Sequence, residues 1–235
     1  MRIITRAEWG ARPPRSRFLI KTPTPKLYLH HAAGAITPGD DKASVLDYSR
    51  IRSIQNYHMD SKGWSDIAYS YLMDPDGFVF EGRGAGVAGG HTAGQNTVSH
   101  AICIMGHYDI QPVDPDLVNR LVEFIVYGFL HKWWPIDLTG GHRDAPGAST
   151  SCPGKNLYAL IPKINQMTGA TYMAGWKKPG DPVVDKSDIK EVHRWQGNRI
   201  LNNQDIDYDE NDPKLLDERH LLIEARIISE FMKSI

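Results

Sequence analysis

Cysteine is scarce in this sequence of 235 residues, which contains only Cys103 and Cys152. A disulfide between them would be disfavoured if the protein is made in a reducing cytosol. Cys103 lies in an apolar run typical of a buried strand, so we expect it to fill a small space in the core. Cys152 lies in a loop rich in Ser, Thr, Pro and Gly, where metal binding or reactivity is the better interpretation.

Long hydrophobic runs and an excess of positive charge are also absent. No window approaches the roughly 18 uninterrupted apolar residues of a membrane span, and residues 121–130 are interrupted by Glu123, Tyr127 and Gly128. Residues 1–9 lack the apolar stretch of a secretory signal. The formal net charge of -1 argues against nucleic-acid binding, which usually needs a basic face. We therefore expect a globular protein with no signal peptide, no membrane insertion and no nucleic-acid partner.

The distribution of apolar residues predicts alternating strands and helices. Strands are expected at residues 27–31, 68–73, 78–81 and 101–105, and helices at 41–58, 116–133 and 157–167. The second and third strands flank Asp74-Pro75-Asp76-Gly77, a turn sequence that predicts a β-hairpin. This order predicts an α/β domain with a mixed central β-sheet flanked by α-helices.

A change in composition divides the chain near residue 175. Residues 175–184 are rich in Lys, Gly and Pro, which is typical of a linker between a domain of residues 1–174 and a small segment of residues 185–235. That segment holds 12 acidic and 8 basic residues. Its apolar residues between 216 and 228 recur at near-helical spacing, so we expect a mostly helical segment that docks or mediates homo-oligomer formation.

Three side chains form a candidate metal site: His30, His142 and Cys152. Catalytic zinc sites use three protein ligands and leave the fourth position to water. His30 ends a predicted strand, where its side chain is held rigidly, and the other two lie in one loop. A thiolate favours zinc over magnesium or calcium, which prefer oxygen ligands. Spacing alone leaves six other histidines open as ligands: His31, His58, His91, His100, His107 and His131.

Several short motifs follow one another between about residues 6 and 167. They are Trp9-Gly10-Ala11-Arg12, Leu29-His30-His31-Ala32, the segment 63–71, Asp76-Gly77 with Glu81-Gly82-Arg83-Gly84, the segment 90–96, Gly141-His142-Arg143-Asp144 and Ser151-Cys152-Pro153-Gly154. Any one of these motifs is weak, whereas the ordered series is specific. In this order the motifs resemble the type 2 N-acetylmuramoyl-L-alanine amidases, a family that includes the peptidoglycan recognition proteins and phage lysozymes of the amidase type.

The resemblance implies roles for individual residues. His30, the first histidine of the His-His pair, would bind one Zn²⁺ together with His142 and Cys152. Tyr69 occupies the family's catalytic tyrosine position and would stabilise the oxyanion through a hydrogen bond. Thr150 lies two residues before the cysteine, where the family carries lysine or threonine, and is a second catalytic candidate.

Substrate contacts are assigned from the same motifs to His31, Trp64, Arg83, His91 and Asn96. For the last two, which lie on a Gly-rich loop, the alternative is a turn that stabilises that loop. Neighbouring side chains of a strand point to opposite faces, so His30 and His31 are not expected to enter one cleft together. Arg143 and Asp144 would either orient His142 or pair with each other.

The implied activity is zinc-dependent hydrolysis of the amide bond between N-acetylmuramic acid and L-alanine in bacterial peptidoglycan. Two rival interpretations stay open: a module that binds peptidoglycan without cutting it, and a structural zinc site closed by a fourth protein ligand such as His91. Family members that only bind lack part of the ligand set, usually the cysteine. Cys152 is present here, which favours the enzyme.

The biological setting is predicted from the lack of an export signal. We expect a phage endolysin that stays in the host cytoplasm until lysis and then acts on the cell wall. A virion lysin or a bacterial wall-recycling enzyme would carry the same catalytic domain, residues 1–174. The segment 185–235 would bind wall polymer or mediate oligomer formation, although its acidic balance gives no attraction to an anionic wall.

Overall fold

The computed structural model describes residues 1–23, 25–34 and 45–173. The chain divides into two compact units, Met1–Thr168 and Gly169–Ile235. The predicted linker, the C-terminal segment and the oligomer contact assigned to it lie outside the described residues, so they stay predictions. Among the described residues, no helix combines the length and the apolar character that a membrane span requires.

Six strands form one mixed sheet in the order β1–β4–β3–β5–β2–β6. Their bounds are β1 (Ile3–Ile4), β2 (Lys26–His31), β3 (Tyr71–Met73), β4 (Val79–Glu81), β5 (Ser99–Ile104) and β6 (Gly140–Gly141). β3 and β4 are antiparallel, as the predicted hairpin requires, and the other neighbouring strands are parallel. The prediction of a mixed central sheet is therefore confirmed.

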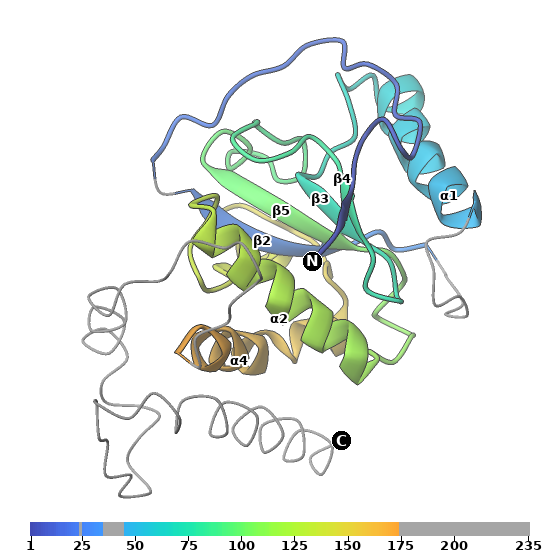
Figure 1. Ribbon diagram of the computed structural model, residues 1–235. Coiled ribbons are helices and arrows are strands. Elements are labelled where there is room, and N and C mark those ends of the chain that lie inside the picture. The colour runs from blue at the N-terminus through green and yellow to red at the C-terminus, as the bar shows by residue number, and fades with distance from the viewer. Residues whose placement is uncertain (24, 35–44, 174–235) are drawn as a thin grey trace, which may run out of the picture. The chain divides into compact units, whose positions relative to one another are not determined.

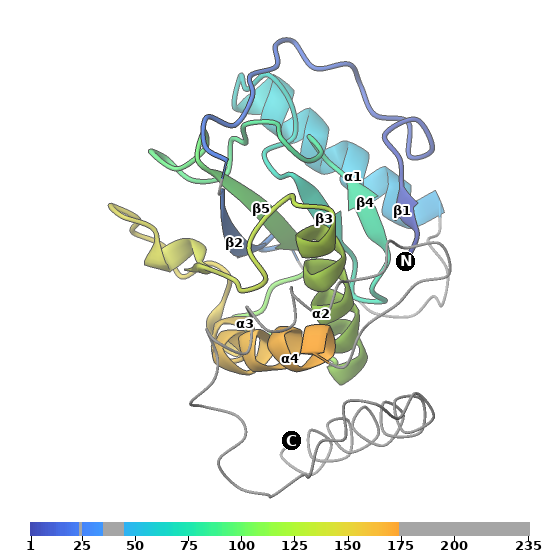
Figure 2. The same ribbon diagram turned by 60° about the vertical axis from the view of Figure 1, so that its left-hand side comes forward.

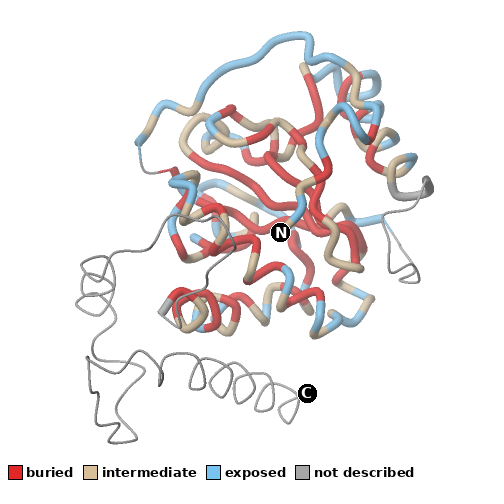
Figure 3. The backbone as a smooth tube through the Cα atoms, in the orientation of Figure 1, coloured by how far each residue is buried: buried red, intermediate tan, exposed pale blue. Residues whose placement is uncertain are grey.

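Helices cover both faces of this sheet. Their bounds are α1 (Val45–Asn56), which continues into a π-helical turn (Tyr57–Ser61), α2 (Pro115–Leu130), a 3-10 turn (His142–Asp144), α3 (Lys155–Tyr158) and α4 (Ile161–Met173). α1 lies over one face, and α2 with the part of α4 up to Thr168 lies over the other (Figures 1 and 2). The buried residues follow the sheet and the helix faces that contact it (Figure 3).

β2 and β5 are adjacent interior strands of the sheet, and β2 carries the candidate ligand His30. Both are buried on their two faces, because a parallel strand covered by helices on each side has no solvated face. Their register sets His30 beside Cys103. Cys103 is fully buried in the core cluster that includes Trp9 and Phe80, so its predicted packing role is confirmed. Both cysteines are free thiols.

α2 illustrates where the sequence pattern and the structure differ. Its start follows simple rules, since Asp114 accepts a hydrogen bond from the Asp116 amide and Pro115 occupies the first turn. It ends at Leu130, not at the predicted residue 133. The chain turns back there because the Trp134 ring packs against Gly128, where an added Cβ would lie 2.0 Å from the ring, and its indole N–H donates to the Ile125 carbonyl (3.0 Å).

Three other elements differ from the prediction. The last helix is interrupted, so that α3 and α4 replace the expected single helix at 157–167. The Gly-His-Arg-Asp segment is not a plain loop, because Gly140–Gly141 form β6 and His142–Asp144 form the 3-10 turn. β1 was not anticipated at all. Two-residue strands carry too little sequence for a period-two pattern to appear.

His100 of β5 gives a testable pH dependence. It is buried, its Nδ1 contacts the Ser70 hydroxyl (2.9 Å), and burial lowers its pKa to about 4. The unfolded chain binds this proton from about pH 6.5 downward, but the folded protein does not until about pH 4. The stability that His100 contributes is therefore complete above pH 6.5 and is lost as the pH falls toward 4, by up to about 1.4 kcal/mol per pH unit.

The variant His100→Gln should lose this dependence. We expect the unfolding free energy of the variant, measured by urea titration between pH 4.5 and 6.5, to change less steeply with pH than that of the unmodified protein. The difference in slope should correspond to about one proton. The control is His131→Gln, which changes an exposed histidine at the end of α2. If His100→Gln kept the full slope, His100 would not be neutral in the folded state.

Candidate metal centre

Strand pairing brings the two histidine ligands together. β6 lies parallel to β2 with Leu29 opposite Gly141, so the residues that follow, His30 and His142, emerge side by side at one end of the sheet. Cys152 comes from the turn before α3. Residues 122 positions apart in the chain are thus neighbours in space.

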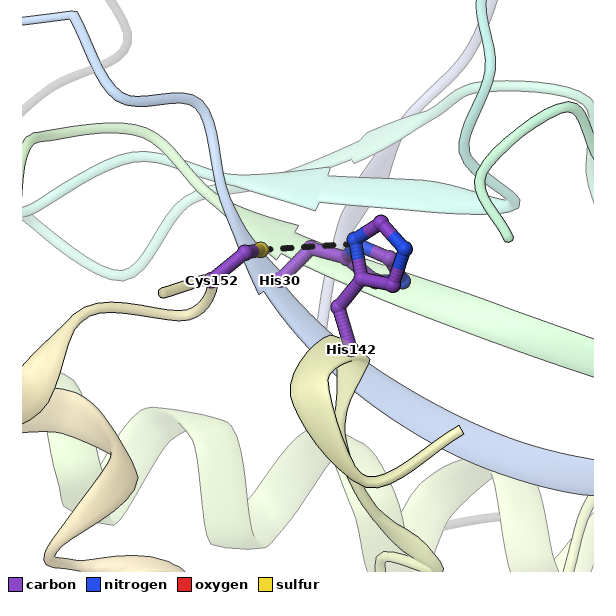
Figure 4. A group of neighbouring side chains, drawn as sticks. All are labelled: His30, His142 and Cys152. Carbon is purple, nitrogen blue, oxygen red and sulfur yellow. Dashed lines mark hydrogen bonds between the residues drawn. The ribbon is translucent and has the colours of Figure 1, made fainter. Parts of the chain in front are cut away.

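The three side chains converge on one point (Figure 4). One ligand atom from each lies within 4.8 Å of the other two. The His30 Nδ1 atom is 3.6 Å from the Cys152 sulfur, and the two imidazole rings are 4.6 Å apart at their centroids. His30 and Cys152 are buried, whereas His142 is partly exposed. Of the three side chains, His142 is the most open to solvent.

The hydrogen bonds of His30 fit a metal ligand. A neutral imidazole that binds a metal through one nitrogen must donate its other N–H. The Nδ1 atom of His30 faces the Cys152 sulfur, and its Nε2 atom is 3.4 Å from the Thr92 hydroxyl, which can accept that hydrogen. The same hydroxyl is 2.9 Å from Nδ1 of His91. The buried pair Thr92 and His91 therefore orients His30.

The charge states of the three groups also suit zinc. Burial lowers the pKa of His30 well below its usual value and lowers that of His142, so both rings are neutral near pH 7. Burial raises the pKa of Cys152 to about 11, against a smaller lowering by the His31 amide, whose N–H points at the sulfur (3.4 Å). Two neutral imidazoles and one thiol that ionises on binding are a typical donor set for zinc.

A second cluster joins His31, His107 and Asp109, whose ligand atoms also lie within 4.8 Å of one another. His31 points away from His30, as the alternation of strand side chains predicts, and lies 5.5 Å from the His107 ring. Its Nδ1 atom accepts a hydrogen bond from the Tyr108 amide (3.2 Å). The proton of the neutral ring is then on Nε2, which leaves no free lone pair for a metal. We assign no metal to this cluster.

Tyr69 lies next to His30, with ring centroids 5.4 Å apart. Its ring is half-buried and borders a hollow of about 270 Å³ whose other walls include Ala32, Ile54 and His58. Burial raises the pKa of Tyr69 well above its usual value, and the nearby Cys103 and Cys152 sulfurs raise it further. The phenol therefore stays protonated and can donate a hydrogen bond beside the candidate metal position.

Thr150 is exposed, and its hydroxyl accepts a hydrogen bond from the Cys152 amide (3.1 Å). This bond fixes the turn that carries the cysteine. The structure thus gives Thr150 a local role in the turn, and its catalytic role stays a prediction.

The proposed substrate contacts differ in their surroundings. Trp64 is 38% exposed, and its ring stacks at 4.9 Å on His58, which lines the hollow beside Tyr69. Arg83 donates to the carbonyl oxygens of Ile67 (2.6 Å) and Ala88 (2.9 Å), so it ties two loops together. Substrate binding stays a prediction for both residues, and the exposed Trp64 is better placed for it.

The Gly-rich loop residues are engaged within the protein. The Asn96 side chain accepts from the Thr92 amide (2.9 Å), which is the loop-stabilising turn given as the alternative. His91 is buried, and its Nε2 atom is 3.4 Å from the Ser99 carbonyl oxygen while Nδ1 faces Thr92. Both ring nitrogens are therefore occupied. This arrangement favours a supporting role over direct ligation of a metal.

Of the two alternatives given for Arg143 and Asp144, the contacts of the described residues favour support of the His142 segment over an ion pair between them. Arg143 donates to the carbonyl oxygens of Ser151 and Cys152, and its guanidinium lies 4.3 Å from the Tyr158 ring. Asp144 accepts from the Gly141 amide and from the Tyr158 hydroxyl, each at 2.8 Å. These bonds fix the backbone on both sides of His142. Sequence reasoning gave no role to Asp109, which lies in no motif, or to Thr92, which lies in the 90–96 motif without being singled out, and it named His58 only as an alternative ligand.

Comparison with known proteins identifies the family of this chain. The family model described as N-acetylmuramoyl-L-alanine amidase matches residues 21–155. Peptidoglycan-recognition protein SC1a of Drosophila melanogaster is 29% identical over 177 residues, which cover 74% of this chain and 88% of that protein. The human N-acetylmuramoyl-L-alanine amidase is 40% identical over 161 residues, which cover 66% of this chain and 27% of that protein.

A solved structure shares the fold as well. Drosophila PGRP-LB, determined as a mutant in complex with tracheal cytotoxin, is 29% identical and superposes with a TM-score of 0.62 over 68% of this chain and 92% of that one. The relatives thus include both a named amidase and named recognition proteins. From the family match over 21–155 and the shared fold, the chain belongs to the N-acetylmuramoyl-L-alanine amidase family that also contains the peptidoglycan recognition proteins.

Proposed function

We propose that the protein hydrolyses the amide bond between N-acetylmuramic acid and L-alanine of peptidoglycan, with one Zn²⁺ held by His30, His142 and Cys152. The observation that carries this proposal is the convergence of these three ligand atoms within 4.8 Å, beside a protonated tyrosine. The relative named as an amidase supports the reaction type, and the cytotoxin complex of PGRP-LB supports a peptidoglycan substrate.

Each residue has a physical task in this reaction. Bound zinc supplies a nucleophile at neutral pH, by lowering the pKa of water, and an electrophile for the amide carbonyl. Thr92 keeps His30 in the tautomer that presents Nδ1. Tyr69 donates a hydrogen bond to the carbonyl oxygen as negative charge develops on it. The hollow bordered by Ile54 and His58 would hold the substrate next to that hydroxyl.

A second candidate function is binding without cleavage, which the relatives named as recognition proteins bring into consideration. A binding module needs no metal ligands at the cleft. The complete set of His30, His142 and Cys152 favours cleavage. A structural zinc closed by four protein ligands is not favoured, because both ring nitrogens of His91 are already engaged.

Digestion of purified peptidoglycan tests the proposal. We expect the full chain to release stem peptides that begin with L-alanine, as detected by mass spectrometry, and we expect a chelator to stop this release until zinc is restored. Release of muropeptides with the sugar still attached would identify a different bond. Wall binding without any release would establish the recognition function in its place.

The setting as a phage endolysin is proposed on the sequence alone. Expression inside a bacterium should cause lysis only when a membrane-permeabilising protein is made with it, and lysis without that partner would contradict the proposed cytoplasmic storage. Removal of residues 185–235 tests their proposed role. If they bind wall polymer or join copies of the chain, sedimentation with walls or the oligomeric mass in solution will fall.

A further inference from the structure

Asp109 lies outside the ligand set but contacts the loop that carries Cys152. This loop, residues 151–155, is called the cysteine loop below. The Asp109 carboxylate accepts one hydrogen bond from the Ser151 hydroxyl and one from the Lys155 amide, each at 2.9 Å. The two donors stand on opposite sides of Cys152 in the chain. A single carboxylate thus bridges both ends of the cysteine loop.

The backbone of residues 108–111, which includes Asp109, also packs tightly on the cysteine loop. The Asn156 amide donates to the Tyr108 carbonyl oxygen (2.9 Å), and the Asn156 side chain donates to the Gln111 carbonyl oxygen (2.7 Å). At Gly154, an added Cβ would lie 2.4 Å from the Tyr108 carbonyl carbon and 2.6 Å from the Asp109 nitrogen. Only glycine allows this approach, so residues 108–111 set the path of the chain after Cys152.

The cysteine loop depends on such side-chain bonds because it belongs to no strand. Thr150 and Ser151 are exposed, so strand pairing and core packing do not hold the chain before the ligand. Arg143 binds the carbonyl oxygens of Ser151 and Cys152 from the other side. Two charged side chains therefore contribute to holding the sulfur near His30, and of these two Asp109 alone contacts both ends of the loop.

We propose that Asp109 is a positioning residue for the zinc ligand Cys152. It holds the cysteine loop so that the sulfur faces His30 and His142 before the ion binds. The inference rests on the proposed function, since it presumes that Cys152 ligates zinc.

Metal affinity measures this role directly. In the full chain we expect Asp109→Ala to weaken zinc binding by about 10- to 100-fold, the usual cost of removing a group that orients a ligand, as measured by competition with a chromophoric chelator. Asp109→Asn should lose less, because its amide oxygen still accepts one of the two bonds. Ser151→Ala should also lose less. The double variant Asp109→Ala/Ser151→Ala should bind zinc no more weakly than Asp109→Ala, because the two residues share one bond.

Cobalt substitution and a control separate positioning from general destabilisation. The thiolate-to-cobalt charge-transfer band should weaken or shift in Asp109→Ala, because the sulfur is displaced while the two histidines remain. Asp114→Ala removes the cap of α2, a hydrogen bond from the Asp116 amide that does not involve the cysteine loop, and should lower the thermal stability but leave the zinc affinity and the cobalt band unchanged.

Zinc affinity of Asp109→Ala equal to that of the unmodified protein would overturn the inference, as would full additivity of the Asp109 and Ser151 losses. If Asp109→Ala fails to fold, Ser151→Ala and Asp109→Asn decide by the same measurement. If the unmodified protein itself bound no zinc, the proposed function would fail, and this inference with it. Zinc binding that is normal in the unmodified protein and in Asp109→Ala would refute the positioning role alone.

Discussion

Replacement of Cys152 by alanine is expected to remove stoichiometric zinc and to abolish the release of stem peptides. The variant keeps only two of the three ligands that converge within 4.8 Å. Removal of a single oxyanion donor lowers kcat by about 10²- to 10³-fold. The loss in Cys152→Ala should be larger, because nucleophile activation and carbonyl polarisation are lost together. Zinc content by elemental analysis and peptide release by mass spectrometry measure the two effects on one sample.

The second cysteine provides a matched control for zinc content. Cys103 is fully buried and paired in register with His30, but it lies outside the ligand group. Cys103→Ser should therefore retain one zinc per chain. If Cys152→Ala retained both its zinc and its peptide release, Cys152 would not be a ligand and the proposed mechanism would be wrong. Loss of release with zinc still bound would point to a role for the sulfur other than ligation.

The candidate ligands could be predicted because the ordered motifs resemble those of a known family, whereas spacing alone left six other histidines open. His30 and His31 occupy one strand, and the rule that neighbouring side chains face opposite ways separates their environments correctly. The structure places His30 beside His142 and places His31 beside His107. A mixed sheet with helices on both faces was also predictable, because the longer elements carry clear periodicity.

The support of the site could not be predicted in the same way. β6 consists of two glycines, which carry no hydrophobic pattern, yet it sets His142 next to His30. Asp109 and Thr92 contact residues distant in the chain through hydrogen bonds, two from Asp109 and one from Thr92 to His30. Such contacts depend on tertiary geometry, and local sequence does not encode them. Arg83, assigned to substrate from its motif, also donates to backbone carbonyl oxygens of two loops, and only the packed structure reveals this second role.

The variant Tyr69→Phe should bind zinc normally but lose about 10²- to 10³-fold in kcat. The phenol ring lies 5.4 Å from the His30 ring, and removal of its hydroxyl deletes one donor without emptying the space that the ring fills. KM should change little, since the hydrogen bond strengthens only as charge develops on the carbonyl oxygen. Initial rates on soluble muropeptides, with zinc content measured in parallel, test this separation. The control is Tyr48→Phe, which removes a phenol hydroxyl from a ring that packs on Phe80 in the core.

The pH dependence of this loss distinguishes a hydrogen-bond donor from a proton acceptor. Burial raises the pKa of Tyr69 well above its usual value, so the phenol remains protonated throughout the neutral range. The ratio of the kcat of the unmodified protein to the kcat of Tyr69→Phe should then stay constant between about pH 6 and 9. If Tyr69 acted as a general base, its ionised form would carry the reaction, and the ratio would grow with rising pH. A growing ratio would therefore contradict the donor role, whereas a constant one leaves the phenol with a single task, to stabilise negative charge on the substrate oxygen.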